Sequence, residues 1–99
     1  MGCNRYQIIM KTLMGKKYGL LILDNNKGNL SGFINILGNS NEICGEMRMD
    51  GSCRFTGEII TPMRCMKFWA EGYIEKNKVD ILIHSDSYLF SVTGQQEII

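Results

Sequence analysis

Apolar and polar residues alternate along most of the chain, and the apolar stretches are short. Segments of about seven to twelve residues are rich in Ile, Val, Phe, Tyr, Thr and Leu, and clusters of Gly, Asn, Asp, Ser and Lys separate them. Short strands at this spacing are typical of an antiparallel meander. Since no segment sustains an apolar period of 3.6 residues, we expect little or no helix.

The pattern predicts eight strands, at residues 5–14, 18–24, 30–37, 42–49, 53–60, 63–75, 78–85 and 87–95. Loop length then decides which residues share a face of the sheet, because side chains alternate between the two faces. A three-residue loop ending at Gly51, with this glycine in the left-handed conformation, gives its two strands one clean apolar face. The same reasoning predicts two-residue loops at Gly15-Lys16, Thr61-Pro62, Lys76-Asn77 and Asp86-Ser87.

Six glycines fall on the predicted apolar face, which is unusual because glycine weakens the interior of a strand. They are Gly19, Gly32, Gly45, Gly57, Gly72 and Gly94. Glycines at inward positions let a sheet coil sharply, as the corners of a barrel require. Close approach of a ligand or of another backbone segment is the alternative reason, and we favour curvature.

An eight-stranded sheet with one apolar face cannot leave that face in water, at a cost of about 25 cal/mol for each Å². We therefore predict an all-β chain, an antiparallel eight-stranded meander that coils strongly into a closed or half-open barrel. The alternative is an open half-barrel sheet that is covered by homodimerisation. The 99 residues suffice for a single domain over 1–99.

Composition excludes several functional classes. Lys and Arg number 11 against 10 Asp and Glu, and this balance is poor for binding nucleic acid. No apolar run approaches the roughly 20 residues of a membrane span, and the beginning of the sequence lacks a signal-peptide pattern. We expect a cytoplasmic protein with neither nucleic acid nor membrane as partner, in which the four cysteines are free thiols.

Catalytic and metal motifs are also absent from the sequence. It contains no phosphate-binding loop and no C-x-x-C, and its one histidine cannot make the usual multi-histidine metal sites. The predicted faces put Cys44, Cys65 and His84 outside, with Cys65 far along its strand from Trp69, the residue opposite His84. A nucleophilic Cys-His pair is therefore not supported, and we expect no enzyme, no metal and no cofactor.

The predicted outer face carries the clearest candidate for a binding site. With the expected loops, one row crosses five strands as Glu46, Arg54, Trp69, His84 and Leu89, and the next rows add Tyr73 and Leu82. An exposed Trp flanked by Arg, His, Leu and Tyr has the composition of a binding hot spot. Arg54 is expected to stack on Trp69 and to pair with Glu46. The alternative is that the aromatic pair only stabilises the sheet.

Three functions follow, in order of preference. The first is protein interaction or assembly, through the outer sheet face or through the edge of the terminal strand at Gln95–Ile99, with an unknown protein or a second copy as partner. The second is a carrier of a small apolar or aromatic ligand inside the barrel. Its cavity would be lined by Met10, Met47, Met49, Phe55, Met66, Phe68 and Phe90. The third is a small enzyme with an outer-face site near His84 and Glu71, for which a hydrogen bond between His84 and a carboxylate would be the sign.

The meander with a glycine in most strands resembles small eight-stranded up-and-down barrels of the calycin type. The G-x-W motif that lipocalin-like chains often show near their start is missing, and Trp69 lies on the sixth expected strand instead. The resemblance therefore implies an architecture, and no functional residue is carried over from it.

Overall fold

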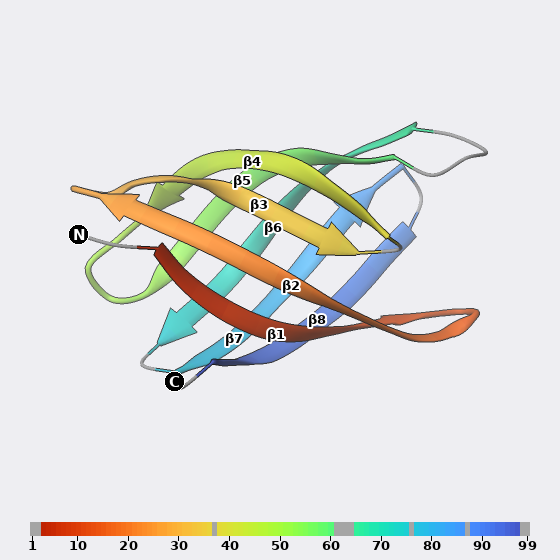
Figure 1. Cartoon of the computed structure of the whole chain (residues 1–99). Coiled ribbons are helices and arrows are strands. Elements are labelled where there is room, and N and C mark those ends of the chain that lie inside the picture. The colour runs from red at the N-terminus through yellow and green to blue at the C-terminus, as the bar shows by residue number, and fades with distance from the viewer. Residues whose placement is uncertain (1–2, 37, 61–64, 76, 87, 98–99) are drawn as a thin grey trace.

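The chain forms an eight-stranded antiparallel barrel that closes on itself (Figure 1). The computed structural model describes residues 3–36, 38–60, 65–75, 77–86 and 88–97. Its strands are β1 (Cys3–Thr12), β2 (Gly15–Asn26), β3 (Asn29–Ile36), β4 (Asn39–Met47), β5 (Ser52–Ile60), β6 (Cys65–Glu75), β7 (Lys78–Ser85) and β8 (Tyr88–Gln96). The described residues include no helix that could cross a membrane. The predicted all-β meander is confirmed, and its closure excludes the alternative of an open half-barrel.

Each strand contributes alternate residues to the interior, as the hydrophobic pattern predicts. Leu21, Ile34, Ala70 and Ile83 are completely buried there. The largest side chains of this core include Phe55, which meets Phe68 edge to face at a centroid distance of 6.3 Å. Such ring pairs add about 0.5–1.5 kcal/mol to what burial alone contributes.

The inward glycines lie where the backbones of two neighbouring strands approach each other closely. A Cβ atom at Gly45 would collide with the carbonyl oxygen of Arg54 and would lie 2.5 Å from the Cα atom of Phe55. At Gly32 the added atom would meet the carbonyl oxygen of Ile22, and the backbone angle φ of +155° itself disfavours other residues. The atoms that exclude a side chain at these positions belong to neighbouring strands of the sheet. The glycines therefore permit the close strand approach that accompanies tight coiling.

Three of the predicted hairpins have the expected register. Arg48 N donates to Ser52 O at 2.8 Å across a three-residue loop, in which Gly51 has φ +92°. The pairs Glu75↔Lys78 and Ser85↔Tyr88 agree with the expected two-residue loops, of which Lys76 and Ser87 lie outside the described residues.

The first hairpin differs from the prediction. Thr12 pairs with Gly15, so the turn is Leu13-Met14 and not Gly15-Lys16, and the register is shifted by four residues. The Thr12 hydroxyl accepts a hydrogen bond from Met14 N and donates one to Gly15 O, and these two bonds hold the turn at its observed position. A shift of four is even, so every side chain keeps its predicted face.

The connection between β5 and β6 differs as well, because it is longer than predicted. Ile60 pairs with Cys65, which shifts this register by two residues relative to a loop at Thr61-Pro62. Residues 61–64, including the two positions expected to begin the sixth strand, lie outside the described residues. This even shift again preserves the faces but moves the rows of the outer surface.

The seam between β1 and β8 completes the barrel and brings the described ends of the chain together (Figure 1). Tyr6 pairs with Gln96, and beyond this pair Glu97 N donates to Arg5 O at 2.8 Å. The edge of the terminal strand, which the sequence suggested as an interaction site, is thus paired with β1 on one side and with β7 on the other. Ile98 and Ile99 of the same prediction lie outside the described residues.

Candidate binding surface

Trp69 is held flat against His84 on the outside of the barrel. The two residues are direct cross-strand partners in β6 and β7, and their rings are parallel within 2° at a centroid distance of 3.9 Å. The Arg54 guanidinium, from β5 on the other side of Trp69, has its Cζ atom 5.3 Å from the indole centroid. Trp69 nevertheless keeps 39% of its surface exposed. The ring is therefore both immobilised and accessible.

Glu71 fixes the orientation of the imidazole. His84 Nε2 lies 3.0 Å from Glu71 Oε2, so a proton on Nε2 is donated to the carboxylate. The carboxylate also lies one row along β6 from Trp69, so a single strand supplies both groups that hold the histidine. Glu71 was predicted beside His84 in the third of the possible functions, and its contact with His84 is the hydrogen bond named above as the sign of an outer-face enzyme.

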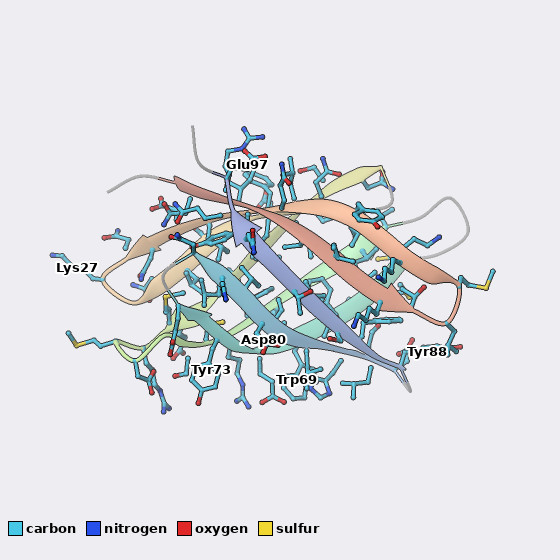
Figure 2. The ribbon with its side chains drawn as sticks, turned by 90° about the horizontal axis from the view of Figure 1, so that it is seen from below. Lys27, Trp69, Tyr73, Asp80, Tyr88 and Glu97 are labelled. Carbon is cyan, nitrogen blue, oxygen red and sulfur yellow. The ribbon has the colours of Figure 1, made fainter. Side chains whose placement is uncertain are left out.

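Apolar side chains surround the stack on the same side of the barrel. Leu82, Leu89 and Tyr73 are 39%, 58% and 54% exposed. Figure 2 shows Trp69 and Tyr73 pointing away from the barrel in the same direction. Together with the charged residues next to them, these side chains form what we call the Trp69 surface: Glu46, Arg54, Trp69, Glu71, Tyr73, Leu82, His84 and Leu89.

The predicted row of five residues is split between two rows. Glu46 faces Arg54 as expected, but Arg54 faces Glu71, and Trp69 faces Thr56. The cause is the two-residue shift between β5 and β6. Arg54 reaches Trp69 along a diagonal, a contact that long side chains make on a sheet.

Two hollows flank the Trp69–His84 stack along the strands. One, of about 610 Å³, lies toward Tyr73 and is lined by charged residues of both signs, including Arg48, Arg54, Glu71 and Asp80. The other, of about 530 Å³, is lined by Thr56, Glu58 and Lys67 in addition to the stack itself. The surface is thus an aromatic ridge between two depressions that are bordered by charged residues.

The residues predicted for an apolar cavity belong mostly to the packed core. Met10, Phe55 and Phe68 are buried, and Met47, Met66 and Phe90 are half-buried against them. Met49 is wrongly assigned, because it stands at the tip of the β4–β5 loop and is fully exposed. The side chains that were to line a cavity therefore contact one another, and this arrangement gives the carrier function no support.

Two thiols, those of Cys53 and Cys65, have surroundings that favour their protonated form. Burial raises the pKa of Cys53 to about 11. The Cys65 thiol donates a hydrogen bond to Glu58 Oε2 at 2.9 Å, which raises its pKa. Because the thiolate is the nucleophilic form, neither group has the environment of a reactive cysteine. Among the described residues, no three His, Cys, Asp or Glu side chains are grouped so that they could hold a metal ion.

An apolar surface that was not predicted lies on the opposite side of the barrel. Tyr18, Leu20 and Ile22 point outward from β2, beside the inward Leu21 and Leu23. The signal was the unbroken apolar run at 20–23, which is atypical of a strand with one solvated face.

The chain matches no protein-family model, and comparisons with curated proteins and with solved structures also find no match.

Proposed function

We propose that this chain is a non-catalytic protein-interaction domain and that the Trp69 surface binds its partner. The observation that supports this most directly is the immobilised but accessible indole of Trp69, stacked at 3.9 Å on His84. A side chain that is ordered before binding loses little further entropy when a partner packs on it. Trp, Tyr and Arg are the residues that most often dominate binding energy at interfaces.

The chemistry of the surface indicates what the partner presents. Leu82 and Leu89 offer exposed aliphatic area next to Trp69, which suits apolar side chains at the centre of a contact. The hollow toward Tyr73 contains Arg48 and Arg54 beside Glu46, Glu71 and Asp80, so it suits a polar rim with charges of both signs. A folded protein surface or a structured peptide provides this combination.

Affinity capture from cells that naturally contain the protein tests the proposal, with Leu82→Arg and Ile60→Arg as a matched pair. Both are exposed aliphatic side chains on outer faces, at 39% and 47% exposure, but Ile60 lies at the end of β5 next to the loop. Wild type and Ile60→Arg should retain a common partner, and Leu82→Arg should lose it by at least about tenfold, about 1.4 kcal/mol. A photo-crosslinking residue at position 89 should form a covalent adduct with the same partner.

Thermal unfolding of each variant, measured beforehand, separates lost binding from lost folding. The proposal fails if Leu82→Arg is folded and retains every partner that wild type retains, or if wild type retains none.

A second candidate function rests on the 3.0 Å contact between His84 Nε2 and Glu71 Oε2. A histidine oriented by a carboxylate is a common arrangement for acid–base catalysis, and here it borders a hollow of about 530 Å³. A panel of chromogenic esters and phosphate esters tests it. Turnover that is lost in His84→Gln and in Glu71→Gln would support an outer-face enzyme, whereas turnover that is unchanged in both would exclude one for these substrates.

A further inference from the structure

Strand β2 is apolar on both of its faces. Leu21 and Leu23 point into the barrel and are buried, while Tyr18, Leu20 and Ile22 point outward. Tyr18 is 71% exposed, and Leu20 and Ile22 are half-buried. Strands that carry apolar residues on both faces are typical of sheets that are covered on both sides.

Neighbouring strands extend this apolar area. Ile9 of β1 lies directly opposite Tyr18, and Phe33 of β3 lies directly opposite Ile22 with 43% of its surface exposed. We call this patch the β2 face, and it consists of Ile9, Tyr18, Leu20, Ile22 and Phe33. Glu97, which contacts Arg5 and Gln7 of β1, lies across the barrel from Trp69 in Figure 2. The β2 face is therefore separate from the Trp69 surface.

Charge is distributed unequally along the β2 face. At one end Lys11 and Lys16 are direct cross-strand partners, and like charges in this position destabilise a sheet. Neither lysine forms an ion pair with a carboxylate of the described part of the chain. Asp24 lies at the other end. Arg5 adds no net positive charge there, because it is paired with Glu97 at 3.1 Å. One end is thus basic and the other acidic.

We propose that the β2 face binds the same face of a second copy of this chain, with Leu20 on the two-fold axis. Along β2 the outward residues read Lys16, Tyr18, Leu20, Ile22 and Asp24. An antiparallel match about Leu20 places Lys16 of each copy over Asp24 of the other, and Tyr18 over Ile22. Asp24 then also comes close to Lys11, so the lysine pair gains the carboxylate that the single chain does not give it. Such an isologous contact closes as a dimer.

The size of the β2 face suits a weak dimer. Three strands at about 4.8 Å spacing, over the length from Lys16 to Asp24, give a face of about 400 Å² per copy. The total of about 800 Å² is in the range of weak, transient interfaces. A groove of about 950 Å³, lined in part by Ile9, Tyr18 and Leu20, hollows this side of the barrel and allows closer contact than a convex wall would.

This dimer goes beyond the proposed function, because it uses the other side of the barrel and does not depend on Trp69. It also differs from a dimer that covers an open half-barrel, because the inner face is buried inside the closed barrel. The predicted affinity is modest and falls with added salt, since two of the matched contacts are ion pairs at the rim.

Sedimentation velocity of the full chain over a range of concentrations tests the dimer. The variants to compare reverse the charge at Lys16 or at Asp24. Lys16→Asp and Asp24→Lys each place like charges together in a homodimer, and each should raise the dissociation constant at least about tenfold. An equimolar mixture of the two variants restores both opposite-charge contacts and should recover a dimer within about threefold of the wild-type affinity. Leu20→Arg, which puts two cations on the axis, should be monomeric, whereas Lys67→Asp, a charge reversal on β6, should dimerise like wild type.

Misfolding does not explain the expected result for Lys16→Asp, because this change replaces a like-charged cross-strand pair with an opposite pair inside one barrel. The proposal is overturned by a wild-type chain that stays monomeric at every concentration. It is equally overturned by a dimer that survives Leu20→Arg, or by single charge variants whose mixture dimerises no better than either alone.

Discussion

The contact between Trp69 and His84 shows how two adjacent residues create a rigid feature on an exposed sheet. Each ring alone would rotate in solvent, but direct pairing across β6 and β7 brings them face to face at 3.9 Å. Arg54 on one side and Glu71 on the other limit what remains of their motion. The same contacts that stabilise the sheet therefore also hold the Trp69 surface in a fixed shape, as the proposed binding requires.

A double-mutant cycle measures the strength of this stack. We expect Trp69→Ala and His84→Ala to show a coupling free energy of about 0.5–1.5 kcal/mol in urea unfolding, because parallel aromatic rings contribute this much beyond burial. The control cycle uses Trp69→Ala with Tyr73→Ala, two outward residues of one strand that are too far apart to touch. Its coupling should stay below about 0.5 kcal/mol, and equal couplings in both cycles would contradict a specific stack.

The buried thiol of Cys53 makes stability depend on pH in the alkaline range. Its pKa is raised to about 11, so the folded state keeps the proton at pH values where the unfolded chain loses it. Stability is therefore complete below about pH 9 and falls as the pH rises toward 11. Burial, and with it the charge of the Cys53 thiolate, also raises the pKa of Tyr6, which extends the loss in the same direction.

Urea unfolding at intervals from pH 7 to pH 11 should show this loss in wild type. Cys53→Ala should flatten the part between pH 9 and 11, although it lowers stability at every pH by removing a buried side chain. Cys44→Ala is the control, because this thiol is exposed. A wild-type profile that is flat up to pH 11 would disagree with the burial of Cys53.

At the scale of elements, the inward glycines make the tight coiling of the barrel testable. Gly45→Ala should lower the free energy of unfolding by about 3 kcal/mol or more, because its Cβ would overlap the Arg54 carbonyl oxygen and the Phe55 backbone. Gly38→Ala is the control, because it introduces backbone strain without steric overlap. Gly38 has open space around it but a φ of +82°, so its change should cost only about 1–2 kcal/mol. Similar losses for both variants would show that close approach of the strands is not the reason for Gly45.

The sequence was sufficient for the faces of the strands but not for all of their registers. Alternation of side chains determines register only modulo two, so both errors, of four residues at Thr12↔Gly15 and of two at Ile60↔Cys65, left each residue on its predicted face. The core was therefore predictable. The rows of the outer surface were not, because they depend on the exact position and length of each turn, which the pattern of polar residues indicates only weakly.

Unusual local composition marks the Trp69 surface in the sequence but does not mark the β2 face. A lone Trp beside His and Arg is conspicuous, whereas Leu20 and Ile22 in β2 look like ordinary core residues until their parity is examined. Met49 was misassigned for a related reason. Its parity is inward, but it stands in the loop after β4 has ended, where parity no longer applies.

At the scale of the whole molecule, the closed barrel separates two outer surfaces. The barrel is flattened, with principal extents of 36, 25 and 19 Å, and the Trp69 surface and the β2 face lie on different sides of it. A dimer formed through the β2 face would direct its two Trp69 surfaces away from each other. Such a pair would hold two partner molecules or engage a repetitive partner with increased avidity.

Because the barrel is closed, we also predict that folding depends on the order of the strands around the barrel and not on the strand at which the chain begins. The seam pairs β1 with β8 and places Glu97 against Arg5, so a linker of a few Gly and Ser residues can join the two ends. A circular permutant with this linker, opened between the exposed Leu13 and Met14, keeps every strand pair and exchanges one short connection for another. We expect the wild-type far-UV circular dichroism spectrum and a free energy of unfolding within about 2 kcal/mol of the wild-type value, because the free energy of loop closure changes little with loop length.

A permutant opened between Asp80 and Ile81, inside β7, should fail to fold, because it cuts a strand whose Ile81 is buried. If the permutant opened at Leu13-Met14 failed in the same way, the seam between β1 and β8 would not be the closed ladder of the structure.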